Sequence, residues 1–305
     1  MRLAVVGSIN TDMTVTAERI PLKGETLMGS SLSYIPGGKG ANQAVAMAKL
    51  GAEVEMFGCV GDDSNGEKML ENLKAVGVGT EHIQILKGVP TGIAMITVGD
   101  NDNTIIVVPG ANGKVDRAYI DSIKSELEKF DMVVLQHEIP LETVHYVIEF
   151  CYEKGIKIVL NPAPAAAVPM EIIDKVTYVT PNEHEAKILF GADTNTVLIF
   201  GDKLSTEDLL RKYPEKLVIT QGSRGVSTCL KDGRILNIPA RKAQVVDTTG
   251  AGDTLNGAFS VQIAEGKAIE DALTYANVAA SLSTEKFGAQ TGMPTAEEVE
   301  TELKK

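Results

Sequence analysis

The sequence predicts an α/β fold: a doubly wound, mostly parallel sheet flanked by helices, with a small β-sheet projecting from it. Short apolar runs rich in β-branched residues alternate with segments of 3.6-residue periodicity along most of the 305-residue chain. The runs do not alternate polar with apolar residues, which is typical of parallel strands covered on both faces. Repeated strand–helix units of this kind wind into one sheet. We therefore expect a single domain over residues 1–305.

The expected strands of the main sheet are residues 3–7, 54–60, 132–136, 156–160, 178–180 and 217–220. The expected helices between them are residues 40–51, 67–77, 117–130, 141–155 and 182–191, and several end in glycine, a common helix stop. Residues 11–36 and 91–108 break this rhythm, because they contain short strands and turns, with a hairpin around residues 99–102. We expect these two segments to pair into a small sheet that forms a lid.

Composition and charge exclude several classes of partner. The net charge is −12, which argues against binding to nucleic acid or to an anionic membrane surface. No apolar run approaches the roughly 18 residues of a membrane span, and the chain starts with a strand pattern rather than a signal peptide. Three widely spaced cysteines, Cys59, Cys151 and Cys229, lie in apolar runs and indicate buried thiols in a reducing compartment. We expect a cytoplasmic protein.

The expected ligand site lies beyond the carboxyl ends of the strands, where open α/β sheets bind their ligands. Small or polar residues follow the strands there. Two common phosphate-binding patterns do not fit. Residues 7–12 (GSINTD) lack the glycines of a dinucleotide-binding turn, and Lys39 is followed by glycine rather than the serine or threonine of a P-loop. A phosphate would therefore be bound by a device of another type.

Two groups of residues are candidates for contacts with a polyol. Asn10 and Asp12 follow the first strand, where they either form a turn or grip neighbouring hydroxyls. Residues 36–43 (PGGKGANQ) open a helix. They are either a glycine turn with a solvated lysine, or a place where a ligand approaches the backbone near donors from Lys39 and Asn42.

Two further segments have a structural and a functional interpretation. Asn182 and Glu185 have the spacing of a helix capping box, or they order magnesium-bound water and phosphate. Residues 220–225 (TQGSRG) follow a strand and form either a plain β-turn or a cradle of backbone amides for nucleotide phosphates.

The stretch VDTTGAGDTLNG (246–257) is the most informative motif. Asp253 could simply cap a helix N-terminus. However, the small residues Gly250, Ala251 and Gly252 expose amides that a cap does not require. A carboxylate beside an anion hole suits phosphoryl transfer to an alcohol, because the carboxylate takes the hydroxyl proton while helix amides and Mg²⁺ stabilise the charge on the transferred group.

Two long segments resemble the signatures of the ribokinase-like carbohydrate kinases, also called the PfkB family. They are GGKGANQAVAMAKLGAEVEMFGCVGDDSNG (37–66) and DTTGAGDTLNGAF (247–259). Four further blocks, at residues 8–12, 161–164, 180–183 and 222–225, resemble the ribose-phosphorylating members and occur in the same order. The resemblance covers nearly the whole chain.

The resemblance implies ATP-dependent phosphorylation of D-ribose at its 5-hydroxyl, with Mg²⁺. It implies that Asp253 is the catalytic base and that the amides of Gly250, Ala251 and Gly252 form the anion hole. The implied sugar-binding residues are Asn10, Asp12, Gly38, Lys39, Asn42 and Glu138. The implied nucleotide-binding residues are Asn182, Thr220, Gly222, Ser223, Arg224, Gly225, Gly252 and Asn277, and Glu185 would act through magnesium-bound water.

The resemblance also implies a monovalent cation, usually potassium, bound mostly by backbone carbonyls in a loop behind the anion hole. The matching positions are Asp247, Thr249, Ser283, Lys286, Gly288 and Gly292. Gly292 departs from the family pattern, because several members carry serine there and a side-chain ligand is then missing. The lid is often a dimer interface in the family, and exposed strand edges are natural places for self-pairing, so we expect a homodimer.

Two alternatives remain open from the sequence. The first is a kinase for another acceptor, such as deoxyribose, fructose or a nucleoside. The second is a non-catalytic sugar or nucleotide sensor on the same fold, which could dispense with Asp253 and the preceding glycines.

Overall fold

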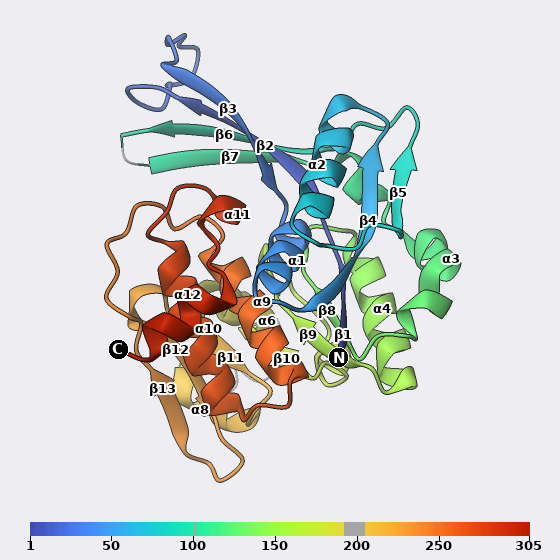
Figure 1. The fold of residues 1–305 in the computed structure, drawn as a ribbon, viewed down its shortest axis with the longest axis vertical. Helices are drawn as coiled ribbons and strands as arrows, with labels where there is room; N and C mark the ends of the chain where they lie inside the picture. Colours follow the sequence, from blue (N-terminus) through green and yellow to red (C-terminus); the bar gives the residue numbers. More distant parts are fainter. Residues whose placement is uncertain (101, 192–204) are drawn as a thin grey trace.

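A six-stranded, fully parallel sheet forms the centre of the computed structural model, which describes residues 1–100, 102–191 and 205–305 (Figure 1). The strand order is β10-β9-β8-β1-β4-β5. In chain order these strands are β1 (Arg2–Val6), β4 (Glu53–Gly61), β5 (Ile83–Leu86), β8 (Met132–Leu135), β9 (Lys157–Leu160) and β10 (Tyr178–Val179). The predicted parallel sheet is thus confirmed, with β5 as a strand that the sequence did not reveal.

Helices cover both faces of this sheet, and successive strand residues point to opposite faces. Leu3 and Val5 belong to a buried cluster with residues of α1 (Lys39–Lys49) and α9 (Ala251–Ala264). Ala4 and Val6 belong to a second cluster with residues of α3 (Arg117–Leu127) and α4 (Leu141–Lys154). Burial on both faces is the reason why these strands show no polar alternation. The helices up to this region are α1 (Lys39–Lys49), α2 (Ser64–Ala75), α3 (Arg117–Leu127), α4 (Leu141–Lys154), α5 (Met170–Ile173) and α6 (Glu183–Gly191), with a short 3₁₀ turn η1 (Gly110–Lys114).

A second, antiparallel sheet adjoins the edge of the first. Its strands are β11 (Val218–Thr220), β12 (Val226–Cys229) and β13 (Ile235–Ile238), with the 3₁₀ turn η2 (Gly222–Arg224) between the first two. Residues 217–220, which we expected to be a strand of the main sheet, therefore belong mainly to this sheet. Two isolated parallel bridges connect them to the edge of the main sheet: Val179 of β10 pairs with Leu217, and Asn182, just after β10, pairs with Thr220. The Val179 N–H donates to the Lys216 carbonyl (2.8 Å) and the Thr220 N–H to the Pro181 carbonyl (3.0 Å), so the two sheets are joined at this edge.

A third sheet projects from the body of the molecule (Figure 1). Its order is β3-β2-β6-β7, formed by β2 (Asn10–Thr16), β3 (Ser31–Gly37), β6 (Gly92–Gly99) and β7 (Asp102–Val108). These strands fall within the two segments that the sequence assigned to a small separate sheet, 11–36 and 91–108, except that β2 begins at Asn10 and β3 ends at Gly37. β6 and β7 form the expected hairpin, of which Asn101 lies outside the described residues. β2 begins only three residues after β1 ends, so this sheet is continuous with the ligand-binding edge of the main one.

The C-terminal part adds α8 (Thr206–Lys212), α9 (Ala251–Ala264), α10 (Ile269–Ser283), α11 (Ala289–Gly292) and α12 (Ala296–Leu303). The helices α1 and α9 approach closely, because Gly257 has no side chain: a Cβ there would lie 2.6 Å from the Cβ of Ala46. This contact brings the N-terminal ends of α1 and α9 together. The three cysteines are buried free thiols, as predicted. Among the described residues, no helix has the length and apolarity needed to cross a membrane.

Candidate active site

Asp253 lies in the first turn of α9 and is 6% exposed. Its carboxylate does not cap its own helix. Instead, Oδ2 accepts a hydrogen bond from Asn42 Nδ2 (2.9 Å) and Oδ1 accepts one from Gln43 Nε2 (3.0 Å), both from α1. The capping interpretation of Asp253 is therefore wrong. Two donors hold a buried carboxylate in one orientation, which is an arrangement expected of a functional group.

Some of the backbone N–H groups at the start of α9 are available to an anion, and others are not. Gly250 adopts a left-handed conformation (φ 77°), which turns the chain into α9. The Ala251 N–H is engaged, since it donates to the Thr248 carbonyl at 3.2 Å. Within the described part of the chain, the N–H groups of Gly252 and Asp253 donate to no acceptor. Unpaired amides at a helix N-terminus attract anions.

The N-terminal end of α1 is held by residues from two strand ends. Gly38 has a positive φ of 87°, and a Cβ there would lie within 3.0 Å of the backbone of residues 8–10. Glu138 Oε2 accepts hydrogen bonds from the Lys39 N–H (3.0 Å) and from the Ser8 hydroxyl (2.6 Å). Glu138 thus caps α1 from the loop after β8, a role that the sequence did not indicate.

Lys39 is surrounded by acidic groups. The carboxylate of Asp253 contributes most to raising the pKa of Lys39, with further contributions from Glu138, Glu185 and Asp12, while burial lowers it. The ammonium group is therefore held in its charged form. Because these five side chains affect one another, the structure gathers sugar-site, magnesium-site and base candidates at one sheet edge.

Asn10 is held by a residue that the sequence analysis missed. Asn112, in η1, is 1% exposed and donates from Nδ2 to Asn10 Oδ1 (2.7 Å), while its own Oδ1 accepts from the Ile9 N–H (2.8 Å). Gly92 allows this contact, because a Cβ there would lie 2.3 Å from Asn10 Oδ1. Asn112 lies in a proline–glycine turn with no recognisable motif, so only its place in the fold reveals its role.

Asp12 lies on the projecting sheet and points its carboxylate at the Cα of Gly37 on the neighbouring strand. Burial, followed by the charges of Glu138 and Asp253, raises the pKa of Asp12 to about 7, whereas Lys39 opposes this shift. A ligand whose hydroxyls donate to this carboxylate would favour its charged form.

A chain of buried polar side chains connects α1, β9, β10 and α9. Gln43 Nε2 also donates to Asn161 Oδ1 (3.1 Å), and Gln136 Nε2 donates to Gln43 Oε1 (2.7 Å). Asn161 Nδ2 donates to the Thr180 carbonyl (3.2 Å), and the Thr180 hydroxyl donates to Asn256 Oδ1. No sequence motif assigned a site role to the four amides of this network, although each stands beside a motif residue: Gln43, Gln136, Asn161 and Asn256. Gln43, Asn161 and Asn256 use both the oxygen and the NH₂ group of their amides, whereas Gln136 Oε1 is buried and accepts no hydrogen bond from the described residues. The paired amides link the strand ends to the helix that orients Asp253.

A cavity of about 580 Å³ lies against the first turns of α9, where Ala251, Gly252 and Leu255 line it. Its walls include six of the predicted nucleotide-binding residues: Thr220, Gly222, Ser223, Gly225, Gly252 and Asn277. Asn182 instead lines an adjoining hollow of about 400 Å³ together with Thr220 and Gly222. Arg224 lines neither, because its guanidinium is exposed and pairs with Glu183. The structure thus brings seven of the eight predicted residues to one continuous region.

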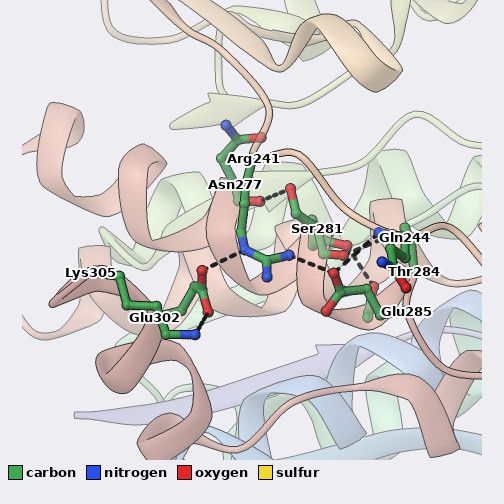
Figure 2. Close-up of polar contacts among 10 residues, drawn as sticks. Arg241, Gln244, Asn277, Ser281, Thr284, Glu285, Glu302 and Lys305 are labelled. Atoms are coloured by element: carbon green, nitrogen blue, oxygen red, sulfur yellow. Dashed lines mark hydrogen bonds and ion pairs between the residues drawn. The ribbon is translucent and has the colours of Figure 1, made fainter.

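The outer wall of this cavity is fastened by an ion-pair network (Figure 2). Arg241, which follows β13, donates from Nε to Glu302 of α12 (2.7 Å) and from Nη1 to Glu285 (2.8 Å). Asn277 of α10 donates from Nδ2 to the Pro239 carbonyl (2.7 Å). The segment after β13 is therefore held against α10 and α12, which keeps the cavity open between them.

Asn182 and Glu185 form the predicted capping box. The Asn182 N–H donates to Glu185 Oε2 (2.8 Å), and the Glu185 N–H donates to Asn182 Oδ1 (2.8 Å). Glu185 Oε1 accepts no hydrogen bond from the described residues, and burial is the main cause that raises the pKa of this carboxyl. The capping box therefore uses one carboxylate oxygen, and the charges of Lys39 and Asp253 act on the same carboxyl: Lys39 lowers its pKa and Asp253 raises it.

The loop before α9 contacts the loop before α11 close to the N–H groups of Gly252 and Asp253. Asp247 accepts from the Thr249 N–H (Oδ1, 2.9 Å) and from the Gly288 N–H (Oδ2, 2.9 Å), so it ties the loops together. The carbonyls of Ser283 and Lys286 point at Gly292, where a Cβ would lie 2.7 Å and 3.3 Å from their oxygens. These residues fit a carbonyl-lined cation site. Among residues 1–100, 102–191 and 205–305, no three histidine, cysteine or acidic side chains are arranged so that they could hold a metal ion by themselves.

Comparison with known proteins shows to which protein family the chain belongs. The model of the pfkB family of carbohydrate kinases matches residues 1–296, and the chain belongs to this family. It is 49% identical to the ribokinase of Bacillus subtilis (strain 168) over 298 residues, covering 98% of both chains. The structure is similar to that of ribokinase from Thermotoga maritima (TM-score 0.88, 34% identity, 99% of both chains covered). It also resembles Arabidopsis thaliana ribokinase complexed with ribose and ATP (TM-score 0.85, 31% identity, 99% and 98% covered).

The raised pKa of Asp12 gives a prediction for stability. Since the folded protein holds the Asp12 proton up to about pH 7 and the unfolded chain releases it near its ordinary value of 3.8, the free energy of unfolding falls as the pH rises between these values. Asp12→Asn has no titrating carboxyl at this position, so the part of the fall in unfolding free energy that Asp12 causes should disappear. We expect the variant to gain stability relative to the parent protein progressively from pH 4 to pH 7, measured by urea unfolding at each pH.

The matched control is Asp232→Asn, which removes a carboxylate that is 61% exposed. This variant should show no such pH-dependent gain. An Asp12 carboxyl that titrates near pH 4 in a carbon-13 NMR titration would contradict the prediction.

Proposed function

We propose that this chain transfers the γ-phosphate of ATP to the 5-hydroxyl of D-ribose, giving ribose 5-phosphate and ADP. The observation that carries the proposal is the placement of Asp253 between two regions. On one side lie Asn10, Asp12, Lys39 and Asn42, and on the other lies the cavity bounded by Gly252. The similarity to ribokinases, including one described with ribose and ATP, supports the choice of substrates.

In the proposed mechanism Asp253 accepts the proton of the 5-hydroxyl. The resulting oxygen attacks the γ-phosphorus, a new P–O bond forms, the bond to the β-phosphate oxygen breaks, and ADP leaves. The N–H groups of Gly252 and Asp253 point toward the charge that develops on the transferred group, as in an oxyanion hole. The two amide donors from α1 keep Asp253 in place during the proton transfer.

The proposed sugar site uses groups whose hydrogen-bonding capacity is not exhausted. The Asp12 carboxylate can accept from two neighbouring hydroxyls, while Asn10 Nδ2 and Lys39 Nζ can donate. Glu138 and Gly38 shape the site through the backbone of α1, as does Asn42 through its remaining N–H. A carboxylate at position 12 favours a vicinal diol, which ribose has and 2-deoxyribose lacks.

The proposed nucleotide site is the cavity with the adjoining hollow. Thr220 and the N–H groups of Gly222 and Ser223 would contact phosphates, because the N–H groups of residues 224 and 225 already donate to carbonyls of the same turn. Asn182 lies beside them, and Asn277 lines the cavity where base or ribose would lie. Gly225 is required by the fold, because a Cβ there would lie 1.9 Å from the Ile238 carbonyl oxygen. Arg224 would contribute only by shaping the turn, because its guanidinium pairs with Glu183 and its N–H donates to the Gln221 carbonyl (3.1 Å).

Glu185 is the residue that would hold Mg²⁺ through water, because one of its carboxylate oxygens is free of the capping box. The ion would neutralise charge on the ATP phosphates.

The three buried thiols favour a reducing compartment, so we also propose a cytoplasmic location, which a fluorescent fusion found elsewhere would contradict.

A substrate panel tests the function. We expect kcat/KM in a coupled ADP-release assay to be highest for D-ribose. The value for 2-deoxyribose should be lower by about 1–3 kcal/mol, roughly 5- to 150-fold, since a hydrogen bond to a charged group is lost. A preference for 2-deoxyribose, fructose or a nucleoside would sink the ribose assignment, and absence of ADP release with every acceptor would favour a sensor.

Replacing the proposed base gives the second prediction. Asp253→Asn keeps the shape of the side chain but cannot accept the proton, so we expect turnover to fall by roughly 10²–10⁴. Ribose binding, measured by calorimetry, should remain within a few-fold. Asp271→Asn, on the exposed side of α10, serves as the control and should be fully active. Near-normal turnover in Asp253→Asn would show that another group takes the proton.

Potassium activation is the third prediction. The proposed ligands are carbonyls and oxygens of Asp247, Thr249, Ser283, Lys286, Gly288 and Gly292, which suit a hard monovalent cation. We expect faster turnover in potassium chloride than in tetramethylammonium chloride. Gly292→Ala should remove most of this difference, because the new methyl group would enter between the Ser283 and Lys286 carbonyls. Equal rates in the two salts would contradict the cation site.

Dimerisation through the projecting sheet is the fourth prediction. All seven residues of the edge strand β7 are exposed, including Ile106 at 66%. After Asp102 the strand carries no charged residue, and an exposed apolar edge strand tends to pair with another chain. We expect a dimer by light scattering and a monomer for Ile106→Lys, whereas the control Leu303→Lys on α12 should remain a dimer. A monomeric parent protein would refute this assembly.

A further inference from the structure

Gln290 is a buried polar residue outside both proposed substrate sites. It lies in the four-residue helix α11 and is 5% exposed. Its Nε2 donates to Asn42 Oδ1 (3.0 Å), and its Oε1 accepts from Asn72 Nδ2 of α2 (2.7 Å). Lys49 Nζ donates to the carbonyls of Gln290 (2.7 Å) and Met293 (3.1 Å), so the backbone at this point is held as well.

Three consecutive hydrogen bonds run from Asn72 through Gln290 and Asn42 to Asp253, and in each of them the NH₂ group of an amide donates toward Asp253. An amide side chain can present either its NH₂ group or its oxygen to a neighbour, and its partners decide which. Asn72 donates to Gln290, Gln290 donates to Asn42, and Asn42 therefore turns its Nδ2 toward Asp253 Oδ2 (2.9 Å). With the Asn42 amide reversed, its oxygen would face the carboxylate in a buried site, which is strongly unfavourable.

The same short helix is joined to the backbone that precedes Asp253. The N–H of Gly288, the residue before α11, donates to Asp247 Oδ2 (2.9 Å). Ala289 packs against Gly250, where a Cβ would lie 2.8 Å from the Ala289 Cβ. One segment therefore contacts both the loop with the open amides and the side chain that orients Asp253. Moving α11 would displace these two parts of the site together.

We propose that Gln290 is a positioning residue for the reaction: it fixes the orientation of the Asn42 amide and, through it, the carboxylate of Asp253, while Asn72 fixes Gln290. The inference rests on the proposed function insofar as Asp253 is the base. It adds α2 and α11, which touch neither proposed substrate, to the groups that set the rate of phosphoryl transfer.

The kinetic test uses Gln290→Met, which keeps the length of the side chain but has no amide. We expect kcat to fall about 10- to 100-fold, with KM for ribose and for ATP within about threefold, since a small displacement of a catalytic group acts on the chemical step. Asn72→Leu should lower kcat less, and the double variant should be no slower than Gln290→Met alone. Gln262→Met, the same replacement in a half-buried residue of α9, is the control and should leave kcat unchanged.

A readout independent of activity is the solvent exchange of the Asn42 side-chain amide, measured by NMR. We expect slow exchange in the parent protein and faster exchange in both Gln290→Met and Asn72→Leu. Unchanged exchange, or unchanged kcat, in Gln290→Met would overturn the proposal; if that variant does not fold, Asn72→Leu decides by the same two measurements. If the parent protein phosphorylates no sugar, the proposed function fails, whereas the exchange rates still decide whether Gln290 holds Asn42.

Discussion

A buried carboxylate, that of Asp253, is the constraint on which the rest of the site depends. Taking an ionised group out of water is costly unless donors replace the water. Here the replacement comes from another helix, since Asn42 and Gln43 of α1 donate to its two oxygens. These bonds require α1 and α9 to pack at close range, which the missing side chain of Gly257 allows. The close packing of α1 against α9 is therefore also what supplies the donors to the Asp253 carboxylate.

The polar side chains around Asp253 form a framework rather than a set of independent contacts. Gln136, Gln43 and Asn161 connect three strand ends to α1, and Asn256 donates back to the Gly252 carbonyl (2.9 Å). Gln43, Asn161 and Asn256 each use both the oxygen and the NH₂ group of their amides, so these three side chains have few alternative orientations. Such a framework holds the Asp253 carboxylate in place relative to the strand ends, which suits the proposed transfer of a group between two bound molecules.

The acidic residues of the site have different environments and so different tasks. Asp12 lies on the projecting sheet, where burial and neighbouring carboxylates raise its pKa to about 7. Glu138 accepts from the Lys39 N–H and the Ser8 hydroxyl through one oxygen, and Asp247 accepts from two backbone N–H groups, so both carboxylates fix loops. Glu185 divides its carboxylate between a capping box and the site. Residue type alone does not separate these roles, because hydrogen-bond partners and burial decide them.

The sequence by itself determined the class of fold, because unbroken apolar strands and periodic helices admit little except a covered parallel sheet. It also determined the main site segments, since residues 37–43 and 247–257 carry local backbone requirements that can be read from glycines and small residues. Tertiary structure alone decided which donors meet Asp253, that Asn112 holds Asn10, and that Glu138 caps α1. It likewise placed residues 217–220 in an antiparallel sheet and joined Gln290 to Asn42 across 248 positions. The reason is physical: strand and helix signals are local, whereas a buried hydrogen bond between distant residues leaves no periodic trace in the chain.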